Sequence, residues 1–116
     1  MATKDAVSDL IRGNIDAIIL CALSSKDSYG YEILKAVATA SRGGYEMKEP
    51  SLYTSLKRLE KQGFVESYWG DETQGARRKY YHMTPAGSTE LIEATERWVR
   101  VRDIIDCLLQ QDGGER

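Results

Sequence analysis

Short polar and cationic side chains recur between residues 50 and 63 with the chemistry needed to bind base edges. The set comprises Ser51, Thr54, Ser55, Arg58 and Lys61. Hydroxyl and guanidinium groups hydrogen-bond to the edges of base pairs, and the major groove of DNA admits one α-helix. Because no long apolar side chain belongs to this set, the segment favours the major groove of a DNA duplex as its partner.

The same segment predicts the amphipathic helix that would hold these groups. Leu52, Leu56 and Leu59 recur at spacings of four and three residues, which marks one apolar stripe. Pro50 fits the first helical turn, where its missing N–H costs nothing, and Gly63 fits the residue just after the helix. We expect the free N–H groups at this helix start, around Pro50, to lie near a phosphate.

The expected DNA contacts divide into two kinds. Ser51, Thr54 and Arg58 are candidates for contacts to base edges or to the nearby backbone. Tyr53 and Lys57 lie one turn apart and should reach phosphates, which fixes the register without reading sequence. The alternative is an ordinary solvated amphipathic helix, which the adjoining hairpin and the preceding helix argue against.

A basic hairpin follows this helix. Its strands are expected at residues 64–68 and 77–83, separated by a turn rich in glycine and polar residues. Alternation puts Arg77 and Lys79 on one face of the second strand and Arg78 on the other. Arg77 and Lys79, with Gln74 and Gly75 of the turn, are expected to meet the DNA backbone or the minor groove. Arg78 would instead pair with acidic residues of the first strand, and a solvated charge cluster is the alternative for all three cations.

Three motifs, in this order and spacing, resemble the PadR family of bacterial transcriptional regulators. They are YGYEILK at 29–35, PSLYTSLKRLEKQGFVE at 50–66 and GARRKYYHMTPAG at 75–87. The resemblance runs from about Asn14 to Asp103 and implies a winged helix-turn-helix that dimerises through its last helix and represses transcription. The short C-terminal region resembles the branch that includes multidrug-responsive repressors. Packing is the simpler expectation for Tyr29 and Tyr31. A phosphate contact from one hydroxyl is the alternative, for which the resemblance slightly favours Tyr29.

The chain as a whole is predicted to be mainly α-helical, of the α+β class. Further helices are expected at residues 7–23, 29–41 and 84–111, and a short strand at Tyr45–Met47. Ser28 is expected to cap the second of these helices and Thr84 the third, with Pro85 in its first turn. The first helix is apolar on most sides, so it should be buried in the core or against a second subunit.

The expected organisation is a winged DNA-binding domain at residues 1–83, a dimerisation helix at 84–111 and a flexible tail at 112–116. An apolar heptad repeat in the last helix predicts a homodimer. Its positions are Leu91, Ala94, Trp98, Val101, Ile105 and Leu108. Spacings that alternate between three and four residues form a seam that a second helix can bury. Packing of this seam on its own domain is the alternative.

The tryptophan in this seam also indicates a ligand site. Trp98 is too bulky to interdigitate as leucine does, so it either anchors a core or props two helices apart. The multidrug-responsive relatives carry a tryptophan at this place, which implies a flat aromatic effector between Trp98 and its symmetry mate, with Val101 and Ile15 nearby. Arg102, one turn on, argues against a preference for cationic ligands.

Length and charge set further limits. The 116 residues suffice for one domain, the sequence has no long apolar run, and no signal peptide is expected. No membrane partner and a cytoplasmic location are therefore expected. The formal net charge is −2, but three cations against one glutamate give residues 50–63 a local net charge of +2. The chain can therefore present a locally basic surface although its overall net charge is negative.

The sequence offers no set of residues for catalysis or metal binding. Cys21 and Cys107 are expected to be buried free thiols, because reduced cysteine is commonly buried. His82, the only histidine, provides neither a metal-ligand set nor a catalytic dyad, and should be a strand residue with a satisfied partner. No enzyme, metal or cofactor is expected, and a protein-interaction adaptor on the same fold is the remaining alternative.

Overall fold

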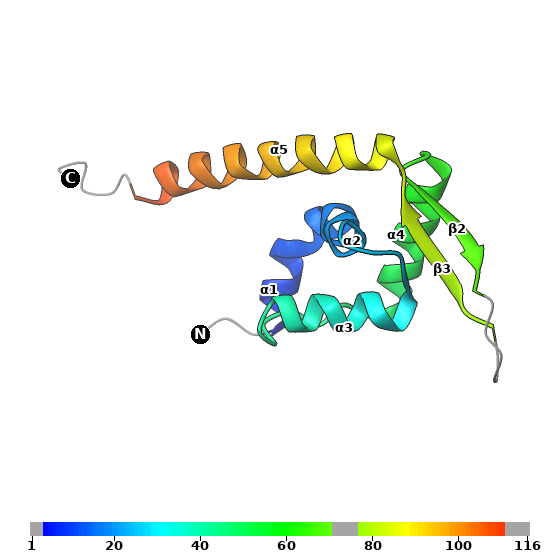
Figure 1. Cartoon of the computed structure of the whole chain (residues 1–116). Helices are drawn as coiled ribbons and strands as arrows, with labels where there is room; N and C mark the ends of the chain where they lie inside the picture. Colours follow the sequence, from blue (N-terminus) through cyan, green and yellow to red (C-terminus); the bar gives the residue numbers. More distant parts are fainter. Residues whose placement is uncertain (1–3, 71–76, 111–116) are drawn as a thin grey trace.

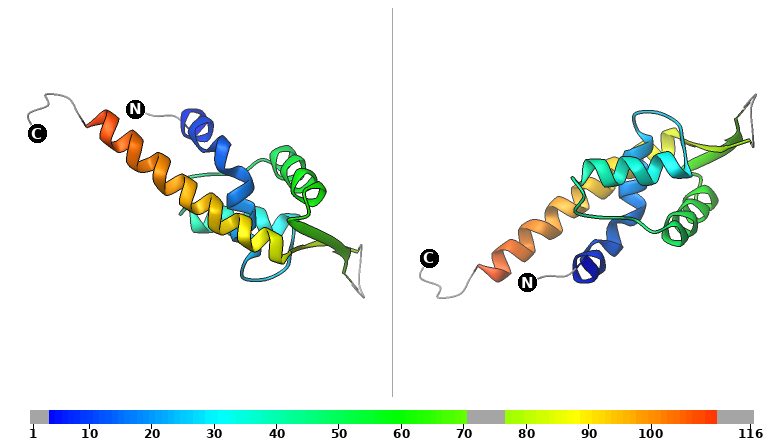
Figure 2. Two further views of the ribbon diagram at one scale, coloured as in Figure 1. Left: turned by 90° about the horizontal axis from the view of Figure 1, so that it is seen from above. Right: turned by 90° about the horizontal axis from the view of Figure 1, so that it is seen from below.

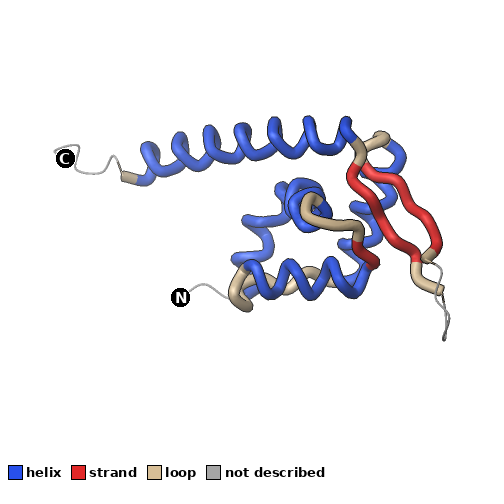
Figure 3. Tube along the Cα trace, in the orientation of Figure 1, coloured by secondary structure: helices blue, strands red, loops and turns tan. Residues whose placement is uncertain are grey.

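The computed structural model describes residues 4–70 and 77–110 (Figure 1). The elements follow in the order α1 (Lys4–Ile11), η1 (Arg12–Asn14), α2 (Ile15–Leu23), β1 (Ser28–Tyr29), α3 (Gly30–Ala40), α4 (Glu49–Lys61), β2 (Val65–Trp69), β3 (Lys79–Met83) and α5 (Pro85–Leu109). Helices α2, α3 and α4 form the body, a small sheet closes one edge, and α5 crosses over α2 (Figures 1 and 3). This is a winged helix with a long C-terminal helix, which confirms the predicted fold class. The predicted tail lies outside the described residues.

One hydrophobic core joins the helices of the body to the sheet. Its fully buried side chains are Ile19, Leu20, Ile33, Leu52, Leu56, Leu59 and Val65. Burial of each such side chain contributes about 1.5–3 kcal/mol. The leucine stripe of α4 therefore faces inward, as predicted, and holds the helix in place while its polar side remains at the surface.

The sheet contains a strand that the sequence analysis missed. The strands are antiparallel in the order β1-β3-β2, and Ser28 of β1 lies opposite Tyr81 of β3. Ser28 is therefore a strand residue and not the cap of α3, a position held by Tyr29. The strand predicted at residues 45–47 is wrong. There the Ser41 hydroxyl accepts from the Tyr45 N–H and donates to the Tyr45 carbonyl, both at 3.1 Å, so a side chain takes the bonds that a strand partner would make.

The helix predicted at residues 7–23 is interrupted. A 3₁₀ turn at Arg12–Asn14 separates α1 from α2, and the two helices run in different directions (Figure 2). Gly13 and Asn14 are poor helix formers, which accounts for the break at this point. The break lets α2 enter the core while α1 lies at the surface.

Helix α4 ends as predicted. Gly63 adopts a positive φ of 82°, a conformation that glycine reaches without steric cost. The Gly63 N–H donates to the Glu60 carbonyl at 3.0 Å, and the Phe64 N–H donates to the Leu59 carbonyl at 2.9 Å. This pair of bonds is a Schellman motif, which satisfies the last carbonyls of the helix and turns the chain into β2.

Thr84 joins the end of α4 to the start of α5. Its hydroxyl oxygen accepts from the Gly87 N–H at 3.0 Å, which confirms the predicted cap, and donates to the Gly63 carbonyl at 2.7 Å. The Thr84 N–H donates to the Phe64 carbonyl at 3.1 Å. These four residues, Gly63, Phe64, Thr84 and Gly87, form the α4–α5 junction.

Helix α5 is packed on the domain in its first part only. Leu91 packs against the core, and α5 lies across α2 (Figure 1). Beyond Trp98 the helix leaves the body, and Val101, Ile105 and Leu108 are exposed. The predicted seam is therefore split between the domain and a free apolar face. No helix in the described part of the chain is long and apolar enough to cross a membrane.

Substitution of Gly87 by alanine should destabilise the fold. A Cβ at this position would overlap the Phe64 carbonyl oxygen and lie 2.9 Å from the Met83 Cγ, so backbone must shift. We expect the free energy of unfolding to fall by about 1–3 kcal/mol, the usual cost of overpacking. Urea denaturation at matched protein concentration measures it. Gly13→Ala is the control, because a Cβ there meets nothing within 4 Å. Equal stability of both variants would contradict this account of the junction.

Candidate nucleic-acid interface

The exposed face of α4 is narrower than the sequence analysis predicted. Tyr53, Thr54 and Lys57 are exposed, whereas Ser51 is half-buried and Ser55 is buried. Ser55 therefore belongs to the inner side of the helix. The exposed side chains of α4 include Tyr53 and Lys57, which are expected to meet phosphate, and Thr54, whose hydroxyl can meet a base.

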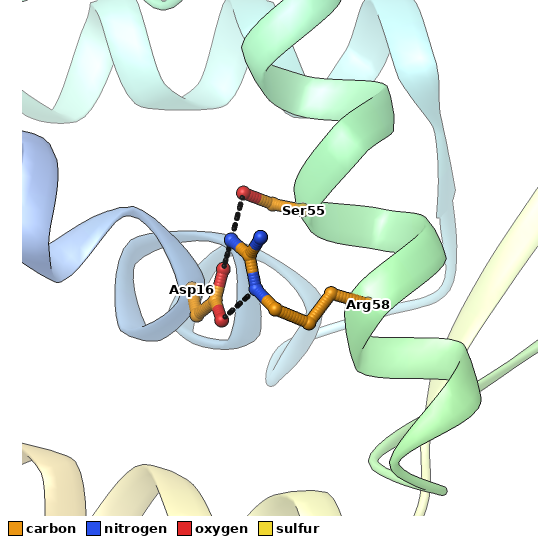
Figure 4. A network of polar contacts seen from close by, with 3 residues as sticks. All are labelled: Asp16, Ser55 and Arg58. Atoms are coloured by element: carbon orange, nitrogen blue, oxygen red, sulfur yellow. Dashed lines mark hydrogen bonds and ion pairs between the residues drawn. The ribbon is translucent and has the colours of Figure 1, made fainter.

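Arg58 is held by a residue that the sequence analysis did not identify. Its Nε donates to Asp16 Oδ2 at 2.9 Å and its Nη2 donates to Asp16 Oδ1 at 2.6 Å (Figure 4). Nη2 also donates to the Ser55 hydroxyl at 3.0 Å. The hydrogen bonds and charge of Asp16 raise the pKa of the Arg58 guanidinium above its ordinary value. Asp16 lies on α2, so this bidentate pair ties α4 to the helix behind it.

The pairing changes what Arg58 can offer to DNA. Among the described residues, no partner is hydrogen-bonded to its Nη1 group, so one edge of the guanidinium is still available. A shallow hollow of about 290 Å³ lies beside Arg58. Its lining residues are Arg12, Ile15, Pro50, Ser51, Thr54, Ser55 and Arg58. Ile15 therefore lies on the α4 side of α2.

Tyr53 lies across the first turn of α3. A Cβ at Gly30 would overlap the Tyr53 hydroxyl and lie 2.9 Å from its Cζ, so the close approach requires glycine. The Tyr53 ring is still half exposed, which leaves it available to a phosphate. Gly30 was quoted in the family motif, but its packing role was not predicted.

Tyr29 is engaged in the sheet. Its ring packs edge-on against Tyr80, with centroids 5.5 Å apart, and Arg78 Cζ lies 4.6 Å from the Tyr29 centroid. This geometry agrees with packing, the simpler expectation for Tyr29, and the phosphate contact stays a prediction. Tyr31 is the more accessible of the two, at 64% exposed. Arg78 stacks on an aromatic ring, a contact that was not predicted for it.

The wing presents two further cations on its other face. Arg77 Cζ lies 5.5 Å from the centroid of Trp69, and Lys79 Nζ lies 5.9 Å from that of Tyr81. Both cations share a face, as alternation predicts. Gln74 and Gly75, which were also predicted to bind DNA, lie outside the described residues.

A polar cluster fastens the wing to the loop before β1. The Tyr68 hydroxyl donates to Asp27 Oδ2 at 2.6 Å, and His82 Nδ1 lies 2.9 Å from Asp27 Oδ1. The bonds from Tyr68 and then His82 lower the pKa of the Asp27 carboxyl below its ordinary value, so this group stays charged. His82 is thus a strand residue with a satisfied partner, which confirms that prediction.

An apolar groove of about 650 Å³ lies on the opposite side of α2 from the Asp16–Arg58 pair. Helices α1, α2, α3 and α5 line it, and Trp98 is among its residues, together with Ile18, Val37 and Leu91. Cys21 also lines the groove, and both it and Cys107 are exposed, so the prediction of buried thiols is wrong. Each cysteine occupies a helix face that no described part of the same chain covers.

The chain matches known regulators over most of its length. Residues 19–93 match the Transcriptional regulator PadR-like family. An uncharacterized protein of Lysinibacillus sphaericus is 41% identical over 103 residues, which cover 89% of this chain and 94% of that protein. A transcriptional regulator from Clostridium thermocellum is 43% identical with a TM-score of 0.79, over 85% of this chain and 93% of the other. A PadR family transcriptional regulator from Eggerthella lenta is 30% identical with a TM-score of 0.80, over 93% and 92% of the two chains.

Release of Arg58 from Asp16 should strengthen binding to DNA of any sequence. Asp16→Asn removes a carboxylate beside α4 and frees the second edge of the guanidinium for phosphate. We expect tighter binding to a mixed-sequence duplex and a salt dependence steeper by about one ion. Fluorescence anisotropy titrations at several salt concentrations measure both. Asp27→Asn, which removes a carboxylate from the wing cluster, is the control. Weaker binding by Asp16→Asn would mean that the pair itself is needed to place Arg58.

Proposed function

Since the chain belongs to the PadR-like family of transcriptional regulators, and is thus a DNA-binding regulator and not an enzyme, we propose that it is a homodimeric repressor. Its DNA target would be a pseudo-palindromic operator, because two-fold symmetry of a dimer is mirrored in the site that it binds. The observation that carries this proposal is the exposed, cationic face of α4 beside a basic wing. The acidic remainder of the chain leaves this face as the surface suited to phosphate.

The proposed DNA contacts follow the exposure of the side chains. Thr54 would contact a base edge in the major groove. Ser51 and the Nη1 group of Arg58, which lie nearer to α2, would contact base edges or the nearby backbone. Tyr53 and Lys57 would bind phosphates and so fix the register of the helix. The wing contributes Arg77 and Lys79, and the N-terminus of α4 at Pro50 lies toward the backbone.

The second half of α5 supplies the proposed dimer interface. Trp98, Val101, Ile105 and Leu108 lie on one side of this helix and are 43–58% exposed in the single chain. An apolar face of this length would cost free energy if left in water, and a second copy offers a matching face. In such a dimer the two α4 helices would enter successive major grooves, about 34 Å apart.

An effector is proposed for the apolar groove that Trp98 lines. A flat aromatic molecule could stack on the indole and fill apolar volume, with Val101 contributed from the dimer face. It would release DNA to the extent that it binds the DNA-free arrangement better. Ile15 faces the hollow beside α4, so we leave it out of this site.

Truncation of Lys57 tests the DNA-binding face. Lys57→Ala should weaken binding to operator and to mixed-sequence duplex alike, and should lower the salt slope by about one, because one phosphate contact is lost. Mobility-shift titrations across salt measure both quantities. Arg100→Ala removes the same charge from α5 and is the control. Equal effects of the two substitutions would mean that net charge alone governs binding, and no shift by the parent protein would favour an adaptor.

Two valines of similar exposure test the dimer face. Val101 lies in the predicted seam and is 45% exposed, whereas Val99 lies off it and is 37% exposed. Val101→Asp places an unpaired carboxylate in the interface, a costly burial, so sedimentation should show monomers. Val99→Asp should remain dimeric. A fully dimeric Val101→Asp variant would show that the dimer uses another surface.

A further inference from the structure

The tip of the wing carries an exposed tryptophan on the same face as its two cations. Alternation along β2 places Trp69 with Val65 and Ser67, and Val65 is fully buried in the core. At Trp69, two residues after Ser67, this face of the strand extends beyond the core, and the Trp69 side chain is 56% exposed. Because more than half of this indole remains in water, its burial contributes little to the stability of the fold.

The indole holds a cation of the wing in place. Arg77 Cζ lies 5.5 Å from the ring centroid of Trp69, and Lys79 lies directly opposite Trp69 in the strand register. A guanidinium stacked on an indole is attracted by the ring and loses part of its freedom to move. The ring therefore fixes one positive charge and lies beside a second.

This face of the wing is turned toward α4. The Ser67 hydroxyl, two residues before Trp69 and on the same face, donates to Glu60 Oε2 of α4 at 2.7 Å. The other face carries Tyr68, which is hydrogen-bonded to Asp27 and stacked on Tyr80 at 5.7 Å. The Trp69 face is therefore the one that lies on the α4 side of the wing.

We propose that Trp69 is a DNA-contacting and positioning residue of the wing: it holds Arg77 against a phosphate and packs its ring on the sugar backbone that flanks the groove occupied by α4. The indole N–H adds a donor for a phosphate oxygen. This assignment rests on the proposed DNA-binding function, because it needs a duplex on α4.

Affinity and salt dependence test the assignment. The probe is a fluorescein-labelled mixed-sequence duplex about three helical turns long. Trp69→Ala should weaken binding about 3- to 10-fold and lower the salt slope by about one, since Arg77 is no longer held at a phosphate. Trp69→Phe keeps a stacking ring and should stay within about twofold of the parent. Arg77→Ala should lose less affinity than Trp69→Ala, because the ring keeps its own contact with the sugar backbone. The double variant should lose no more than Trp69→Ala alone, because Arg77 acts through the ring.

Tyr68→Ala is the matched control, an aromatic truncation at the neighbouring position on the other face. It should bind with the parental salt slope, and thermal melts of all variants exclude loss of fold as the cause. An unchanged affinity and slope for Trp69→Ala would overturn the assignment while the parent still binds DNA. A parent that binds no DNA would overturn the proposed function as well.

Fluorescence supplies a second readout that a purely structural role would not alter. The chain has two tryptophans, so Trp98→Phe leaves Trp69 as the only emitter. Saturation with the duplex should reduce acrylamide quenching of Trp69 about threefold or more, because the sugar backbone covers the ring. Equal quenching with and without DNA would refute the contact even if the affinity of Trp69→Ala had fallen.

Discussion

The relation between α4 and α5 depends on one hydroxyl group. The Thr84 side chain accepts the N–H of Gly87 at the start of α5 and donates to the carbonyl of Gly63 just past the end of α4. Gly87 then brings the first turn of α5 against the Phe64 carbonyl, where no side chain fits. The helix with the proposed DNA-binding face and the helix assigned to the proposed dimer are thus fixed to each other by hydrogen bonds of Thr84 and by the close approach of Gly87 to the Phe64 carbonyl. A large rotation of either helix would break these hydrogen bonds, whose lengths are 2.7–3.1 Å.

Helix α2 supports the same two helices from behind. One of its faces lines the apolar groove with Trp98, and the other carries Asp16, which grips Arg58 of α4. A molecule in the groove would contact α2, which is also bonded to Arg58 on the proposed DNA-binding face. The structure therefore provides a short physical route between the proposed effector site and the proposed DNA contacts, through packed side chains and one ion pair.

Features set by neighbours in sequence were predictable. The leucine stripe of α4, the glycine that ends it and the Thr84 cap each depend on residues within one turn, and all three were identified correctly. The pairing of Ser28 with Tyr81 and the grip of Asp16 on Arg58 join residues more than 40 positions apart. No pattern among residues that are close in the sequence identifies such partners. The missed strand and the unpredicted carboxylate belong to this second kind. The exposed thiols were missed because the sequence does not show which helix faces the rest of the chain leaves uncovered.

The site shows the same division. Alternation correctly placed Arg77 and Lys79 together, because that pattern is a property of one strand. The sequence could not show that Arg58 donates two hydrogen bonds to Asp16, or that the position of Tyr53 requires glycine at residue 30. Leu91 looked like any other seam residue, yet it packs on its own domain, since the seam begins before α5 leaves the body.

Because α5 is long, a small tilt at its first helical turn moves its far end by a large distance. Its 25 residues extend about 37 Å at 1.5 Å per residue, so a tilt of about 5° at the Thr84 end displaces the far end by about 3 Å. In a dimer held together at the far ends, the same tilt moves the DNA-binding faces relative to each other. Sub-ångström changes in packing around Trp98, near the middle of the arm, would be magnified before they reach the DNA. The stiffness of α5 would then determine how precisely the spacing between the two DNA-binding faces matches the spacing between the two half-sites.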